Sequence, residues 1–134
     1  MSTELETAVW SLYNNDAALK ASLSGGFHNT EAEQKAVMPF GVFQVISNTQ
    51  RLTFSEDQED FLLQIKVFSD KKSSSELNNM YTQIKRVFDF AVFTLSGYTS
   101  IYCKRAHAIK TKTDERWQYT TTYRILIEKD VSVR

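Results

Sequence analysis

The side chains in this sequence best suited to nucleophilic chemistry are one cysteine, Cys103, and two histidines, His28 and His107. Cys103 and His107 lie four residues apart in a segment that alternates like a β-strand, so we expect both side chains on one face. Four residues of strand span about 13 Å, which is too far for a thiolate–imidazole pair. The spacing argues against a cysteine enzyme and predicts that Cys103 is a packed thiol.

Motifs that bind metals or phosphates are absent from the sequence. The histidines form no His-x-x-x-His pair and the cysteine no Cys-x-x-Cys pair, so we predict no zinc site. The four glycines form neither a Gly-x-Gly-x-x-Gly motif nor a P-loop. The acidic residues between Glu56 and Asp60 do not have the spacing of a calcium loop. We therefore predict no catalytic residue, no cofactor, no metal and no enzymatic activity.

Two clusters of opposite charge remain as candidates for contact with other molecules. Each has a plain interpretation, the acidic one as a solvated turn and the basic one as a strand edge guarded by lysines. Alternatively, the basic segment faces nucleic acid or the acidic loop of a neighbouring subunit, because a ring needs two different complementary patches on each subunit. The candidate interface residues are Glu56, Asp57, Glu59, Asp60, Lys104, Arg105, Lys110, Lys112 and Arg116.

Size and composition indicate one globular domain over residues 1–134. Sixteen basic and sixteen acidic residues give a net charge of zero, which argues against a dedicated nucleic-acid binder. A single cysteine cannot form an internal disulfide, which fits a reducing compartment. The N-terminus lacks the features of a signal peptide. The apolar stretch Val87–Leu95 is interrupted by Asp89 and too short to span a bilayer, so we expect no membrane association.

The first part of the chain is predicted to be helical. Thr3, followed three residues later by a glutamate, has capping-box spacing and predicts a helix start. Asp16 is expected to cap a second short turn that runs to Leu23 and ends at Gly25-Gly26. The following segment leaves alternatives open, because Phe27-His28 resembles a short extended piece while residues 31–37 fit either a short helix or a polar loop.

The middle of the chain predicts a hairpin after a boundary at Pro39. Phe40–Asn48 is rich in β-branched and aromatic residues, and Asp60–Ser69 alternates apolar and polar residues. We expect the polar segment Thr49–Gln58 to be the long connection between these two strands.

The C-terminal half predicts a helix and two further strands. Ser73, with a glutamate three residues later, marks the helix start. Residues 98–111 and 116–128 alternate like a two-stranded antiparallel ribbon with a charged turn. The apolar stripe of the helix comprises Leu77, Met80, Tyr81, Ile84, Val87 and Phe88. The order α-β-β-α-β-β predicts an α+β fold, a single antiparallel sheet of about four strands with helices packed on one face.

This order of elements resembles a known family. An Asn-Asp-Ala-Ala-Leu phrase at Asn15–Leu19 precedes two glycines, and a proline precedes an aromatic-valine strand. A strand ending in Val67–Ser69, a capped helix and two closing strands follow, the last with an Arg-Ile-Leu-Ile run at Arg124–Ile127. The pattern is similar to the tail completion or tail terminator proteins of long-tailed bacteriophages.

The resemblance implies a small structural α+β subunit without catalytic activity. Such subunits assemble in the host cytoplasm into a ring, usually a hexamer, at the head-proximal end of the virion tail. The ring ends polymerisation of the tail tube protein and offers a surface to the head completion or connector protein. DNA passes through its lumen without sequence-specific binding.

Two other functions remain open from the sequence. A head-to-tail connector or joining protein is the nearest variant. A small α+β module that binds an apolar ligand is the alternative from another class, since six tyrosines and nine phenylalanines could line a pocket. An inward-facing polar group among Phe61, Ile65 and Tyr123 would favour the ligand-binding module, and the sequence indicates none.

Overall fold

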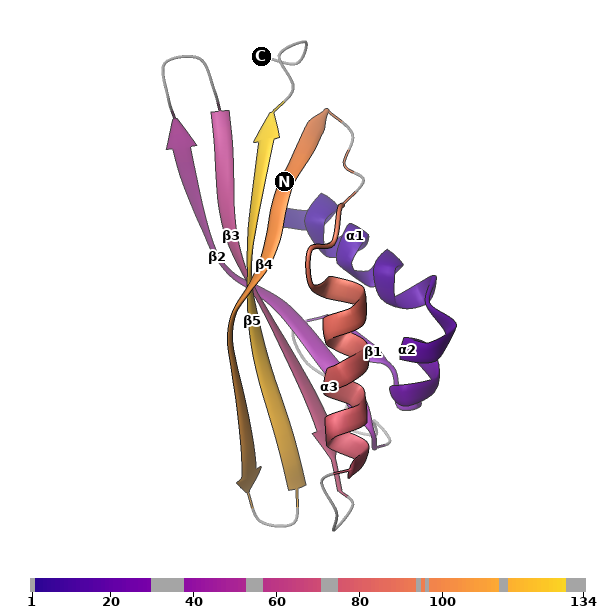
Figure 1. Cartoon of the computed structure of the whole chain (residues 1–134). Coiled ribbons are helices and arrows are strands. Elements are labelled where there is room, and N and C mark those ends of the chain that lie inside the picture. The colour runs from indigo at the N-terminus through magenta and orange to yellow at the C-terminus, as the bar shows by residue number, and fades with distance from the viewer. Residues whose placement is uncertain are drawn as a thin grey trace.

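Helices and strands form two layers in the computed structural model, which describes residues 2–29, 38–52, 57–70, 75–93, 95, 97–113 and 116–129. The helices are α1 (Ser2–Asn14), α2 (Ala17–Ser22) and α3 (Ser75–Phe88). The strands are β1 (Phe27–Asn29), β2 (Phe40–Leu52), β3 (Asp57–Ser69), β4 (Tyr98–Thr113) and β5 (Arg116–Lys129). The three helices cover one face of the twisted sheet (Figure 1). The predicted α+β class and the one-sided helical layer are confirmed.

The sheet of the described residues has five strands in the order β1-β2-β3-β5-β4. β1 runs parallel to β2 and the other pairs are antiparallel. The prediction of about four strands, all antiparallel, is therefore wrong, because a three-residue strand is too short to recognise by alternation. Phe27 of β1 lies beside Gly41 of β2, where an added Cβ would approach the Phe27 ring to 3.0 Å.

The β2–β3 hairpin is longer than its sequence predicts. Thr49–Leu52 and Asp57-Gln58, which we expected in the connection, are paired strand residues, and Leu52 lies opposite Asp57. The backbone groups of these residues are paired across the hairpin, which allows polar residues to continue the strands. The hairpin prediction is confirmed, whereas the long polar connection is wrong.

The helix boundaries test the predicted caps. Asp16 is the N-cap of α2 and accepts a hydrogen bond of 2.9 Å from the Leu19 backbone N–H. It also pairs with Arg86 of α3, and the bonds from Arg86 and then Leu19 lower the pKa of the Asp16 carboxyl. The predicted cap at Thr3 is wrong, because α1 begins at Ser2. The caps and segments predicted at Ser73 and 31–37 lie outside the described residues.

The core lies between the helices and one face of the sheet. The predicted α3 stripe and the alternate residues of β3 and β5 meet there, each burial contributing about 1.5–3 kcal/mol. Phe27 joins the layers, with its ring centroid 5.0 Å from Tyr13 and 4.7 Å from Phe43. The fully buried residues of this interface include Phe61, Leu63, Leu77, Met80, Phe88, Tyr123, Ile125 and Ile127. Among the described helices, none has the length and apolarity to cross a membrane.

Candidate interaction surfaces

Cys103 lies on the helix-covered face of β4 and has no exposed surface. Burial raises the pKa of its thiol to about 12. The thiol therefore stays protonated at neutral pH and is a poor nucleophile. The prediction of a packed thiol is confirmed.

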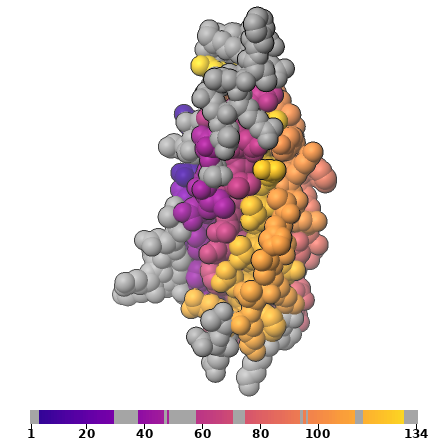
Figure 2. Space-filling model, turned by 90° about the vertical axis from the view of Figure 1, so that its left-hand side faces the viewer, coloured from indigo at the N-terminus to yellow at the C-terminus, as the bar shows by residue number. Residues whose placement is uncertain are grey.

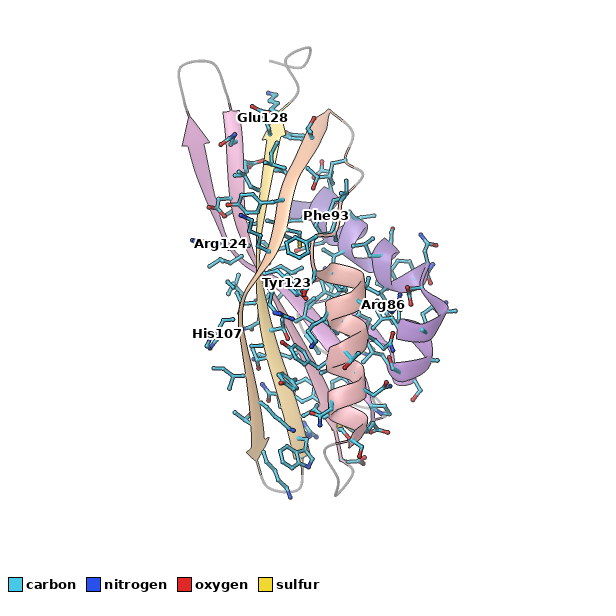
Figure 3. All side chains as sticks on the ribbon, viewed as in Figure 1. Arg86, Phe93, His107, Tyr123, Arg124 and Glu128 are labelled. Carbon is cyan, nitrogen blue, oxygen red and sulfur yellow. The ribbon has the colours of Figure 1, made fainter. Side chains whose placement is uncertain are left out.

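The expectation that Cys103 and His107 share a face is wrong. The register between β4 and β5 slips by one residue after Arg105, so that Arg105 lies opposite Tyr123 while His107 lies opposite Thr122. One extra residue in a strand turns the following side chains to the other face. Figure 3 shows His107 on the uncovered side of the sheet and Tyr123 between the sheet and α3.

The described residues contain no group of three or more histidine, cysteine, aspartate or glutamate side chains able to hold a metal ion. His28 instead has its Nε2 atom 3.0 Å from the Gly25 carbonyl oxygen. The residues that could line an apolar pocket, Phe61, Ile65 and Tyr123, are at most 1% exposed and packed in the core. The inward polar group of this set is the Tyr123 hydroxyl, which a neighbouring carboxylate binds.

A polar cluster under the end of α3 holds the helix to the sheet. The Tyr123 hydroxyl donates a 2.7 Å hydrogen bond to Asp89, and Arg105 of β4 lies 3.2 Å from the other carboxylate oxygen of Asp89. Burial and the bond to Asp89 raise the pKa of Tyr123. The next residue, Phe90, has a positive φ of 61° and donates its backbone N–H to the Cys103 carbonyl. Sequence reasoning missed this cluster, because its members are far apart in the chain.

The predicted basic segment divides between the two faces of β4. Lys110 donates to Asn78 of α3 at 3.0 Å, and its Nζ atom lies 5.2 Å from the Trp117 ring, as does that of Lys112. With Arg105, whose guanidinium lies 5.8 Å from the Tyr81 ring, they form the helix-side cations. These three side chains already have partners within the chain.

The other basic residues project from the uncovered face. Lys104 lies over the Tyr102 ring at 4.6 Å, and the Arg116 guanidinium lies 5.7 Å from the Phe68 ring. Two cations that sequence reasoning left out occupy the same face, in the polar positions of β3 and β5. We call the following set of four cations and one histidine the cationic face: Lys66, Lys104, His107, Arg116 and Arg124.

The acidic cluster is also divided. Glu56 and the Asp57 side chain lie outside the described residues. Glu59 accepts a 3.2 Å hydrogen bond from Asn48, whereas Asp60 is only 7% exposed and lies on the opposite side of β3. The interpretation of this cluster as a solvated turn is wrong for Glu59 and Asp60, which are paired strand residues.

The remaining acidic and basic residues mark opposite ends of the sheet. Glu59 and Asp60 lie near the β2–β3 tip together with Glu128 of β5, and the basic residues Arg51 and Lys129 occupy strand positions at the same end. The β4–β5 tip, with Lys110, Lys112 and Arg116, lies at the other end (Figure 1). The structure thus separates an acidic end from a basic end, although it does not bring either predicted cluster onto one face.

An exposed apolar loop follows α3. Phe90 is 78% and Val92 76% exposed. Beside it, Val92 and Phe93 line an open hollow of about 300 Å³ together with α1 residues that include Leu12. Phe90 adopts a positive φ, which is strained for a bulky residue, and its exposed ring gains no packing energy in return. Strained backbone that carries exposed apolar side chains is typical of a contact site.

The fold defines an α+β protein with three helices on one face of a five-stranded mixed sheet. Its sequence matches the model of the family described as tail completion protein gp17 over residues 7–128, and the chain belongs to that family. The resemblance predicted from the sequence is confirmed. The protein is a structural component of the virion tail and not an enzyme.

A solved structure shares the fold of this chain. A chain from the virion of a native gene transfer agent particle superposes with a TM-score of 0.82 at 13% sequence identity. The match covers 94% of this chain and 96% of that chain. No curated protein matches this sequence.

Proposed function

We propose that this protein forms a closed ring, a hexamer, at the head-proximal end of the tail tube. The ring stops addition of tube subunits and offers its outer surface to the head completion or connector protein. Membership of the tail completion family supports this proposal, and one structural observation carries it: the acidic and basic ends lie at opposite ends of the sheet.

The separation of charge matters because a ring of identical subunits needs a heterologous contact. Each subunit must present two different surfaces that complement each other. The acidic end and the β4–β5 tip are such a pair, and each is distant from the other within one subunit (Figure 1). The exposed loop at Phe90 and Val92 offers apolar area that a neighbouring subunit would bury.

The test is the mass in solution, measured by light scattering after size exclusion over a wide concentration range at two salt concentrations. We expect a closed species of about six times 15.5 kDa that high salt weakens. A monomer at all concentrations contradicts self-assembly into a ring.

Charge reversal identifies the contact. Lys110→Glu with Lys112→Glu makes both ends acidic, and Glu59→Lys with Glu128→Lys makes both ends basic. Each double variant alone should lose the ring, because like charges would meet at every contact. An equimolar mixture should restore a ring with an even number of subunits, in which the two variants alternate and opposite charges meet at every contact. Lys20→Glu, on α2, is the control for a general charge effect. Rings that persist in both variants would contradict the proposed contact.

The terminator role and the head-joining role are separated by tube assembly. Added to polymerising tube protein, a terminator should shorten the tubes and appear as a cap at one tube end by negative-stain electron microscopy. Unchanged tube length and uncapped ends would instead favour a joining protein.

A further inference from the structure

The uncovered face of the sheet carries lysine and arginine side chains from β3, β4 and β5, among polar and apolar residues. Figure 2 shows β2, β3, β5 and β4 side by side across it. Four of the five residues of the cationic face are exposed, and Lys66 is half-buried. From this surface we propose that the uncovered face binds duplex nucleic acid through its phosphate backbone, without sequence preference.

The first observation is a pair of like charges. Lys104 and Arg124 lie directly opposite each other on β4 and β5. Like charges in this position destabilise a sheet, so folding alone does not favour this pair. A row of phosphates between the two side chains turns the repulsion into attraction.

The second observation is the bulge after Arg105. The extra residue, Ala106, turns His107 to the uncovered face, in the row next to Lys104 and Arg124. Figure 3 shows His107 and Arg124 on the same side of the sheet, away from the helices. The bulge therefore adds a nitrogen-bearing side chain to this face and directs Arg105 to the other one.

The third observation is the distribution of acids. In the described strands, the carboxylates assigned by register to this face are Asp60 and Glu128, both near the acidic end. Along β5 from Arg124 to Arg116, a distance of about 27 Å, the register places Thr122, Thr120 and Gln118 between the two arginines on this face. Duplex DNA carries one negative charge per about 1.7 Å of axis, so a face of this length meets several phosphates.

The same features favour a duplex over single strands and over a protein. Single-strand surfaces stack bases on exposed aromatic rings. The aromatic residues of this face are covered, since Phe40 is buried, a lysine lies over Tyr102 and an arginine lies beside Phe68. The two most exposed large apolar residues, Phe90 and Val92, lie outside this face, which carries one exposed large apolar residue of the regular strand register, Ile109.

This inference deepens the proposed function and rests on it for location, because it names the face that a ring would turn toward DNA. Binding and assembly are nevertheless measured separately. Mass reports the ring and fluorescence anisotropy reports DNA binding, so failure of one is distinguishable from failure of the other.

The experiment uses a fluorescein-labelled 24-base-pair duplex titrated with the full chain at several salt concentrations. The variant Lys104→Gln with Arg124→Gln removes two phosphate contacts and the like-charge pair. We expect about tenfold weaker binding at 50 mM salt and a slope of log K against log salt that is smaller by about 2. The matched control, Lys20→Gln with Lys85→Gln, removes the same charge from the helical layer and should bind within about twofold of wild type.

Several outcomes would overturn the proposal. These are no binding by the wild-type chain, equal loss in the two double variants, or a strong preference between two duplexes of unrelated sequence. Loss of the ring in the K104Q/R124Q variant without DNA would also overturn it, because the face would then hold a second copy. An unchanged mass with weaker DNA binding supports the proposal even if the mass is that of a monomer.

Discussion

The helix-covered face of the sheet and its uncovered face are made from alternate residues of the same strands, yet their side chains have different neighbours. On the covered face, Phe61, Tyr123 and Ile125 are fully buried against the helices. On the uncovered face, Arg124 and His107 reach solvent (Figure 3). The covered face therefore carries the free energy of folding, and the uncovered face can hold charges that do not help folding.

The largest expected effect comes from comparing alanine substitutions of two phenylalanines that lie two residues apart, one buried and one exposed. Phe88 is fully buried beside Phe27 and Tyr123, so Phe88→Ala should lower the free energy of unfolding by about 3–5 kcal/mol. Phe90, 78% exposed, should change it by less than about 0.5 kcal/mol on substitution by alanine. Urea unfolding measures both. Equal losses would mean that the Phe90 loop is part of the core.

The next test concerns two tyrosines on opposite faces. Tyr123→Phe removes the hydroxyl that donates a hydrogen bond to Asp89, and should lower the free energy of unfolding by about 1–3 kcal/mol. Tyr102→Phe, on the uncovered face, should change it by less than about 0.5 kcal/mol. Thermal unfolding of the two variants checks the difference, and a neutral Tyr123→Phe would show that the cluster does not stabilise the end of α3.

A smaller effect is expected in the helical layer. Asp16→Ala removes the N-cap of α2 and the pair with Arg86 and should cost about 1 kcal/mol, whereas Asp16→Asn keeps a capping oxygen and should cost less. The folded state lowers the pKa of this carboxyl, so its contribution is present above the ordinary value of 3.8 and is lost as pH falls through the lower folded-state value. Urea unfolding from pH 6 to pH 2 should show the wild type and Asp16→Asn converging at the acid end.

The smallest expected change in the free energy of unfolding has opposite signs for charge removal on the two faces. Lys104→Gln with Arg124→Gln relieves a like-charge pair and should raise the unfolding free energy by a few tenths of a kcal/mol. Lys110→Gln with Lys112→Gln removes the bond to Asn78 and the contacts with Trp117, and should lower it by a similar amount. Precise urea midpoints compare the two. A loss of stability in the first variant would assign a structural role to the uncovered cations.

The sequence predicted the parts of the fold that depend on local periodicity. The stripe of α3, the alternation of β3 and β5, and the cap at Asp16 were all visible, because a buried face repeats every two or every 3.6 residues. Element order then sufficed for the family resemblance. The three-residue β1 has no period to detect, and its parallel pairing with β2 depends on tertiary packing.

The candidate site was harder to predict, since two of its determinants are not local. The bulge at Ala106 reverses the face of every following residue in β4, so Lys110 and Lys112 were grouped with Lys104 although they lie on the other side. Strand order was the second determinant. β5 lies between β3 and β4, which brings Lys66 and Arg124 to the surface that carries Lys104.

The bulges of β4 also bear on how the open edge of the sheet resists aggregation. β4 is a sixteen-residue edge strand, and a long regular edge is a template on which another chain can add a strand and start aggregation. Register breaks after Ser100 and Arg105 interrupt the line of backbone donors and acceptors, and lysines flank it. The exposed edge of β4 is thereby protected from pairing with a strand of another chain.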